Sequence, residues 1–76
     1  MKKRLSEMPV GKTGVITEIE NDDILLKLME MGCIPGETVF VNQLAPLGDP
    51  ISIIVAGYEL SLRRDEAKMI WVEEIR

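Results

Sequence analysis

The chain has 76 residues, with 9 basic and 13 acidic side chains that give a formal net charge of -4. That length allows one domain, residues 1–76, with a thin core, and the negative charge argues against a module that binds nucleic acid. The sequence contains no histidine and one cysteine, which disfavours metal enzymes, Cys–His nucleophiles and disulfide scaffolds.

Glycine, proline and acidic residues divide the first half of the chain into one strand and one helix. The pattern predicts a strand at 15–19 and an α-helix at 23–31. Side-chain oxygens at 21–23 suit the cap of that helix, where acidic groups also oppose the helix dipole favourably. Gly32 is typical of a helix C-terminus because glycine most easily adopts the left-handed conformation there. The Pro-Gly pair at 35–36 predicts a type II turn.

The second half of the chain has the composition of a sheet. The two prolines of segment 45–50 lack the N–H donor that a strand ladder needs, so this segment must connect strands. Gly57 alone separates two alternating segments and therefore demands a tight hairpin. The predicted strands cover 38–44, 51–56, 58–62 and 69–73, with one helical turn at 63–68. Five short strands and one helix predict a mainly β fold, either a small barrel or a curled sheet.

Four segments in this order resemble FeoA proteins, which are small accessory proteins of bacterial ferrous iron uptake. They are Lys-Leu-Met-Glu-Met-Gly at 27–32, Pro-Gly at 35–36, Ala-Pro-Leu-Gly-Asp-Pro at 45–50 and Gly-Tyr-Glu-Leu-Ser-Leu-Arg at 57–63. The likeness extends from about residue 5 to residue 72. It implies a five-stranded SH3-like barrel with the α-helix between the first two strands. Lys27 stands where the family more often has arginine, and lysine acts as a point charge rather than a planar fork.

The resemblance also implies a partner, the membrane transporter FeoB, which has a cytoplasmic GTP-binding domain. We therefore expect a non-enzymatic accessory protein, without a cofactor, that docks on the cytoplasmic part of FeoB. The alternative is a metal-responsive SH3-like module related to the C-terminal domain of iron-dependent repressors. A general peptide- or nucleic-acid-binding barrel is disfavoured by the negative charge and by the presence of three aromatic residues in all. Self-association remains open.

The predicted helix supplies the first candidate partner surface. From residue 24 to residue 31, six of eight residues are apolar, and they cover an arc of roughly 220°, wider than an ordinary core-facing stripe. We expect residues 25, 28 and 29 to face the barrel. Leu26 lies at one edge of the arc and Met31, with residue 24, at the other, so at least one edge should stay exposed and bind a partner.

The loop at 45–50 and the basic pair at 63–64 supply the second candidate surface. Pro46 and Leu47 lie in a rigid connection, which favours a structural role but leaves a partner-facing loop open. Arg63 and Arg64 precede two acidic residues that satisfy much of their charge locally. The alternative for this pair is a basic contact with an acidic partner surface.

Metal and membrane sites have weaker support. An acidic cluster, whose carboxylate oxygens could bind a divalent metal ion, consists of Glu18, Glu20, Asp22 and Asp23. Helix capping by the aspartates and a solvent-exposed strand face for the glutamates explain the cluster more simply. No metal site is therefore assigned. We expect Cys33 to be a small buried residue. The longest apolar runs have four residues, far short of the roughly 20 that a membrane-spanning helix needs. A domain without disulfides or an apolar leader fits the cytoplasm.

Overall fold

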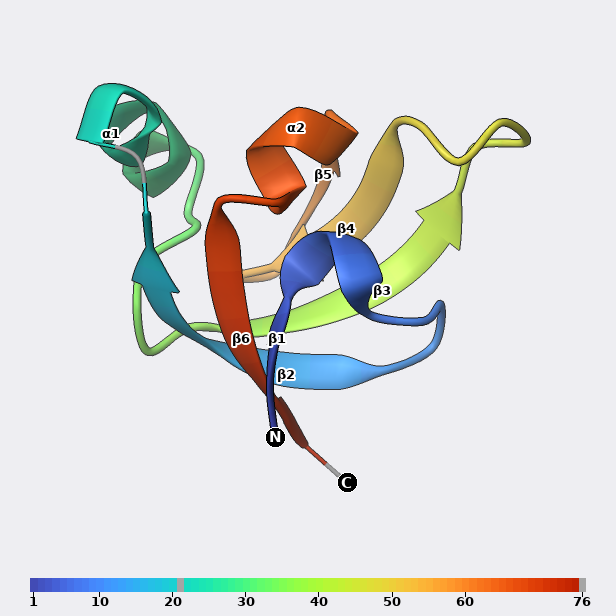
Figure 1. Ribbon diagram of the computed structural model, residues 1–76, viewed down its shortest axis with the longest axis horizontal. Helices are drawn as coiled ribbons and strands as arrows, with labels where there is room; N and C mark the ends of the chain where they lie inside the picture. Colours follow the sequence, from blue (N-terminus) through green and yellow to red (C-terminus); the bar gives the residue numbers. More distant parts are fainter. Residues whose placement is uncertain (21, 76) are drawn as a thin grey trace.

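A six-stranded antiparallel sheet curls around the core, with strands in the order β1-β6-β2-β3-β4-β5 (Figure 1). The computed structural model describes residues 1–20 and 22–75. Among these residues, no helix has the length and apolar character needed to cross a bilayer. The elements in chain order are β1 (Lys2–Arg4), the 3₁₀-helix η1 (Leu5–Glu7), β2 (Thr13–Ile19), α1 (Asp22–Glu30), β3 (Thr38–Leu44), β4 (Ile51–Val55), β5 (Tyr58–Leu62), α2 (Arg64–Ala67) and β6 (Ile70–Ile75).

The mainly β class is confirmed, but the described part of the chain has six strands rather than five. The additional strand is β1, which pairs with β6 through Lys2 opposite Glu73 and Arg4 opposite Trp71. Three consecutive basic residues carry no alternation of apolar and polar side chains, so pattern analysis misses this strand. Its pairing depends on partners that lie far away in the sequence. The expected helix positions hold, with α1 between the first two long strands and α2 before the last strand.

Alternating side chains from the strands build the core, as the sequence pattern predicts. η1 adds Leu5, α1 adds Leu28 and α2 adds Ala67, and all three are fully buried. Cys33 is buried as well, as expected. The buried apolar residues are Leu5, Met8, Ile16, Leu28, Cys33, Val39, Val41, Ile51, Ile53, Val55, Leu62, Ala67, Ile70 and Val72.

Both turns predicted after α1 are present. Gly32 has a φ of 102°, and the Cys33 N–H donates to the Leu28 carbonyl at 2.9 Å. This bond, five residues back along the chain, is typical of a Schellman cap and places Cys33 beside the last turn. Gly36 has a φ of 98°, and the Glu37 N–H closes its turn. Asn21, part of the predicted N-terminal cap, lies outside the described residues.

The orientation of α1 differs from the prediction. Leu28 is buried, and Ile24 and Met31 pack against the core, whereas the Met29 side chain is 38% exposed. The inward stripe therefore contains residues 24, 28 and 31 rather than 25, 28 and 29. These residues are spaced i, i+4 and i+7, the usual spacing of a core-facing stripe, and Met29 falls outside it. Leu26 is 66% exposed, as predicted for one edge of the arc.

The β4–β5 hairpin also differs in detail from the prediction. The strand predicted at 51–56 ends at Val55, so two residues, Ala56 and Gly57, form the turn. Their φ values are 52° and 83°, which is the type I′ geometry that matches the twist of a hairpin. Alanine hides this turn from sequence analysis because it rarely adopts a positive φ.

Candidate docking face

Both α-helices and the 45–50 loop lie along one side of the barrel, at the top of Figure 1. The three segments come from different parts of the sequence, and α2 lies between the other two. We call this side the helical face. It is made of Leu26, Lys27, Pro46, Leu47, Arg63, Arg64, Glu66 and Lys68.

An ion pair joins α1 to α2. The Lys27 Nζ lies 2.9 Å from the Glu66 Oε2, while the Glu66 Oε1 accepts the Arg63 backbone N–H at 2.9 Å. The Lys27 hydrogen bond, followed by the Arg63 N–H, lowers the pKa of the Glu66 carboxyl. Glu66 therefore both caps the short α2 helix and positions it against α1.

A second set of polar contacts joins α2 to the 45–50 loop. The Arg64 N–H donates to the Asp49 Oδ1 at 3.0 Å, and the Arg64 Nη1 donates to the Gly48 carbonyl at 3.4 Å. Within the loop, the Gly48 N–H donates to the Ala45 carbonyl at 2.7 Å. The loop tip is thus held in place, with Pro46 exposed and the Leu47 side chain 96% exposed.

The exposed side chains of the helical face combine apolar groups with charges of both signs. Arg63 and Lys68 are exposed, and neither side chain forms an ion pair with another described residue. The exposed carboxylates of Asp65 in α2 and Asp49 in the loop offset this charge. Apolar anchors beside these unpaired cations suit a partner surface that offers apolar pockets with nearby carboxylates.

Most of the predicted partner-binding residues meet on this face. Leu26, Pro46, Leu47, Arg63 and Arg64 are exposed there. Met31 does not belong with them because it is half-buried against the core. Met29, which the sequence analysis expected to face the barrel, is exposed instead. The Lys27–Glu66 pair was missed too, since it joins residues 39 positions apart.

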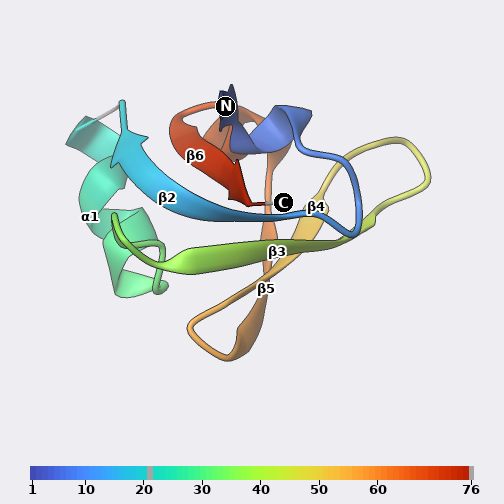
Figure 2. The same cartoon turned by 90° about the horizontal axis from the view of Figure 1, so that it is seen from below.

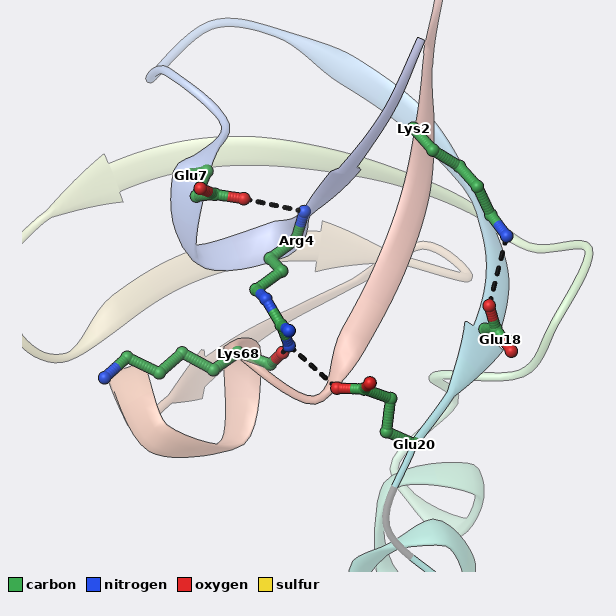
Figure 3. Close-up of polar contacts among 6 residues, drawn as sticks. All are labelled: Lys2, Arg4, Glu7, Glu18, Glu20 and Lys68. Carbon is green, nitrogen blue, oxygen red and sulfur yellow. Dashed lines mark hydrogen bonds and ion pairs between the residues drawn. The ribbon is translucent and has the colours of Figure 1, made fainter.

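Two residues of the predicted acidic cluster, Glu18 and Glu20, pair with the cations of β1, as Figure 3 shows. The Lys2 Nζ lies 3.0 Å from the Glu18 Oε1, and the Arg4 Nη1 lies 2.7 Å from the Glu20 Oε1. Arg4 also donates to the Lys68 carbonyl at 2.6 Å, and its guanidinium lies 4.5 Å from the centre of the Trp71 ring.

These contacts change how the acidic cluster is interpreted. The Arg4 hydrogen bond, followed by one from Trp71, lowers the pKa of Glu20. Glu18 and Glu20 thus hold β1 in place through ion pairs. No group of three potential metal ligands occurs within residues 1–20 and 22–75. Burial raises the pKa of the Cys33 thiol to about 11, so this side chain remains a neutral core residue.

Known protein families and sequences include some that are similar to this chain. The FeoA domain family matches residues 3–74 of the chain. A fusion protein of Fe(2+) transport protein A and the Fe(2+) transporter FeoB from Porphyromonas gingivalis (strain ATCC BAA-308 / W83) is 42% identical over 73 residues. That match covers 95% of this chain, which spans 9% of the length of the fusion protein.

Two solved structures have a fold similar to that of this chain. FeoA from Stenotrophomonas maltophilia, complexed with zinc and described as a prokaryotic SH3 domain protein, is 31% identical with a TM-score of 0.81, covering 100% of this chain and 96% of that one. A manganese-dependent transcriptional repressor is 20% identical with a TM-score of 0.87, covering 97% of this chain and 42% of the repressor. The likeness to the repressor supports the SH3-like fold and carries no conclusion about function.

Proposed function

The chain belongs to the FeoA family, and we propose that it is a non-enzymatic accessory protein that docks on the cytoplasmic part of the FeoB ferrous iron transporter. The observation that carries this proposal is the Porphyromonas gingivalis fusion, in which a related segment is joined to FeoB in one chain. Covalent linkage by a short linker raises the effective concentration of two modules to the millimolar range, which favours an interface of modest affinity. A separate chain of the same family needs a surface that recognises the transporter.

The helical face is the surface best suited to this docking. Leu26 and Leu47 offer exposed apolar side chains at its two ends, and Arg63 and Lys68 place positive charge between them. The Lys27–Glu66 and Arg64–Asp49 contacts hold α1, α2 and the loop in one arrangement. Less conformational entropy is then lost on binding, which improves affinity. The complementary transporter surface offers apolar pockets, with carboxylates opposite Arg63 and Lys68.

Modulation of the transporter follows from unequal affinities. An accessory protein shifts a conformational equilibrium only by the difference between its affinities for the two states. A tenfold shift in population requires about 1.4 kcal/mol of such a difference. We propose that the helical face binds one nucleotide state of the cytoplasmic FeoB domain more tightly than the other.

Binding to the cytoplasmic region of FeoB from the same organism tests this function. Titration calorimetry with the GDP-bound and GTP-analogue-bound forms should give saturable binding with unequal affinities. Leu47→Asp should weaken binding at least tenfold, whereas Val10→Asp, an exposed apolar position on the loop before β2, should not. Absence of binding to both forms and to intact FeoB in detergent would contradict the proposed docking.

A further inference from the structure

One side of α1 faces away from the rest of the molecule. Figures 1 and 2 both show α1 at one end of the barrel, with no other described element beyond it. Because a helix turns by about 100° per residue, the positions opposite its core-facing stripe are those around Leu26. They are Asp22, Leu26, Met29 and Glu30, all of them exposed. We call these four residues the outer α1 face.

The centre of the outer α1 face is apolar. The Leu26 side chain is 66% exposed and the Met29 side chain 38% exposed. Residues three positions apart are neighbours on a helix surface, so the two side chains form one short apolar ridge. Such ridges fit the grooves of a second helix. The shape of this face therefore suits helix packing.

The net charge of the chain is concentrated in the segment that contains α1. Residues 18–37 hold six acidic side chains and one basic side chain, a net charge of -5, so the other residues together sum to +1. The basic side chain is Lys27, which is paired with Glu66. Asp22 and Glu30 form no ion pair with another described residue. The unbalanced charge of the outer α1 face is therefore negative.

The cations of neighbouring elements do not offset this charge. The Arg4 Nη1 lies 2.7 Å from the Glu20 Oε1, and Figure 3 shows the Lys68 side chain pointing away from α1. Arg63 and Arg64 lie against the loop that precedes β4. The carboxylates of the outer α1 face thus remain available to a cationic partner.

The charge of Glu30 is unfavourable for α1 itself. Asp22 lies in the first turn of the helix, where an acidic side chain opposes the helix dipole favourably. Glu30 is the last residue of the helix, where the dipole favours a cation instead. Residues that break a local rule in this way often serve a function. Beside an exposed apolar ridge, that function is recognition of positive charge.

We propose that the outer α1 face binds a basic amphipathic helix of a partner protein. The apolar side of that helix packs on Leu26 and Met29, while its lysine or arginine side chains pair with Asp22 and Glu30. The apolar contact supplies most of the affinity, and the charges determine orientation and specificity. α1 has nine residues, a length of about 14 Å. The inference does not depend on the proposed FeoB docking, although Leu26 belongs to both surfaces.

A second copy of the chain does not supply such a helix. Its α1 would bring the same carboxylates into contact, and like charges opposite each other are unfavourable. Its α2 has four residues, too few to cover the outer α1 face. The cations of its β1 are all paired with glutamates of the same chain.

Nuclear magnetic resonance with a model helix tests the proposal. The probe is a capped peptide of about 14 residues, long enough to form a helix, with leucines along one side and lysines beside them. Titrated into the ¹⁵N-labelled protein, it should give saturable shifts centred on residues 22–30. A matched peptide with glutamate in place of lysine should not bind. A peptide of the same composition in scrambled order should bind at least fivefold more weakly.

Reversing one charge separates recognition from stability. Glu30→Lys should weaken peptide binding at least fivefold and at the same time raise the thermal midpoint, because a cation suits the end of a helix. Asp65→Lys makes the same change in net charge on α2 and should leave the affinity unchanged. Leu47→Asp, which should weaken FeoB binding, should leave peptide binding intact, so the two proposals can fail separately.

Three results would overturn the proposal. They are no saturable shifts at millimolar peptide, equal binding of the lysine and glutamate peptides, and equal losses of affinity in Glu30→Lys and Asp65→Lys. Shifts centred on α2 or on the loop at 45–50 would also contradict it, since they would place the basic helix on another surface.

Discussion

The Lys27 ammonium of α1 lies 2.9 Å from the Glu66 carboxylate of α2, and this ion pair links two helices that are 39 residues apart in the sequence. The Lys27 side chain is largely exposed, whereas Glu66 is mostly buried. Because Glu66 also accepts the Arg63 N–H, one carboxylate determines both the start of α2 and the position of α1 on the helical face.

Glu66→Gln should loosen the helical face with little loss of overall stability. The amide oxygen can still accept the Arg63 N–H, so the main loss is the ion pair, worth about 0.5–1 kcal/mol for a partly exposed contact. Hydrogen exchange should speed up in α1 and leave β2, β3 and β6 unchanged. Glu30→Gln makes the same chemical change at an exposed position of α1 and serves as the control. Equal exchange rates in both variants would show that the Lys27–Glu66 contact does not restrain α1.

Acidification should destabilise the fold through its paired glutamates. Hydrogen bonds from Arg4, Lys27 and Lys3 lower the pKa values of Glu20, Glu66 and Glu74, respectively, below the ordinary value of 4.5. A carboxyl whose pKa is lower in the folded state contributes stability above its unfolded pKa and loses it as the pH falls through the folded pKa. The thermal midpoint should therefore be constant from pH 7 to about 5.5 and decline below about 4.5. A steady midpoint down to pH 3 would rule out these contacts as stabilising.

Leu26 and Leu28 are two residues apart but should respond in opposite ways to substitution. Leu26 is 66% exposed and Leu28 is buried. Leu26→Asp should change the free energy of unfolding by no more than about 1 kcal/mol, which is the scale of helix propensity. Leu28→Ala should cost about 2–5 kcal/mol because it opens a cavity in the core. Urea denaturation measures both values, and a large loss in Leu26→Asp would place that side chain in the core.

The hairpin turn should be sensitive to backbone conformation alone. Gly57 has a φ of 83°, and a Cβ added there would meet no atom within 4 Å. Gly57→Val should thus lose about 1–3 kcal/mol from backbone strain rather than from a clash of its Cβ. Ala56→Asn should gain about 0.5 kcal/mol, since asparagine tolerates the positive φ of a type I′ turn better than alanine does. Denaturation midpoints that move in the same direction for both variants would contradict this geometry.

The isolated protein should bind ferrous iron weakly. The sequence has no histidine, Cys33 is buried, and Glu18 and Glu20 are already paired with Lys2 and Arg4. Anaerobic titration calorimetry should give no saturable site with a Kd below about 1 μM, which corresponds to roughly -8 kcal/mol. A single tighter site in solution would overturn this expectation.

Local signals made much of the fold predictable. The strand patterns, the helix end at Gly32 and the turn at 35–36 each depend on neighbours within a few residues, where backbone preferences and side-chain alternation act directly. The exposure of Leu26, Pro46 and Leu47 was predictable for a similar reason. Leu26 lies at the edge of an apolar arc, and Pro46 and Leu47 lie in a segment that cannot join a sheet.

The sequence by itself determined the elements and the class of fold, since short-range sterics and hydrophobic periodicity are written along the chain. Only the tertiary structure decided how those elements meet. β1 forms because it pairs with the distant strand β6, and Met29 is exposed because residues 24, 28 and 31 pack on the core instead. The helical face is one surface because Glu66 reaches Lys27. Each of these outcomes depends on contacts between distant residues, whose free energy appears only when the chain has closed the intervening loops.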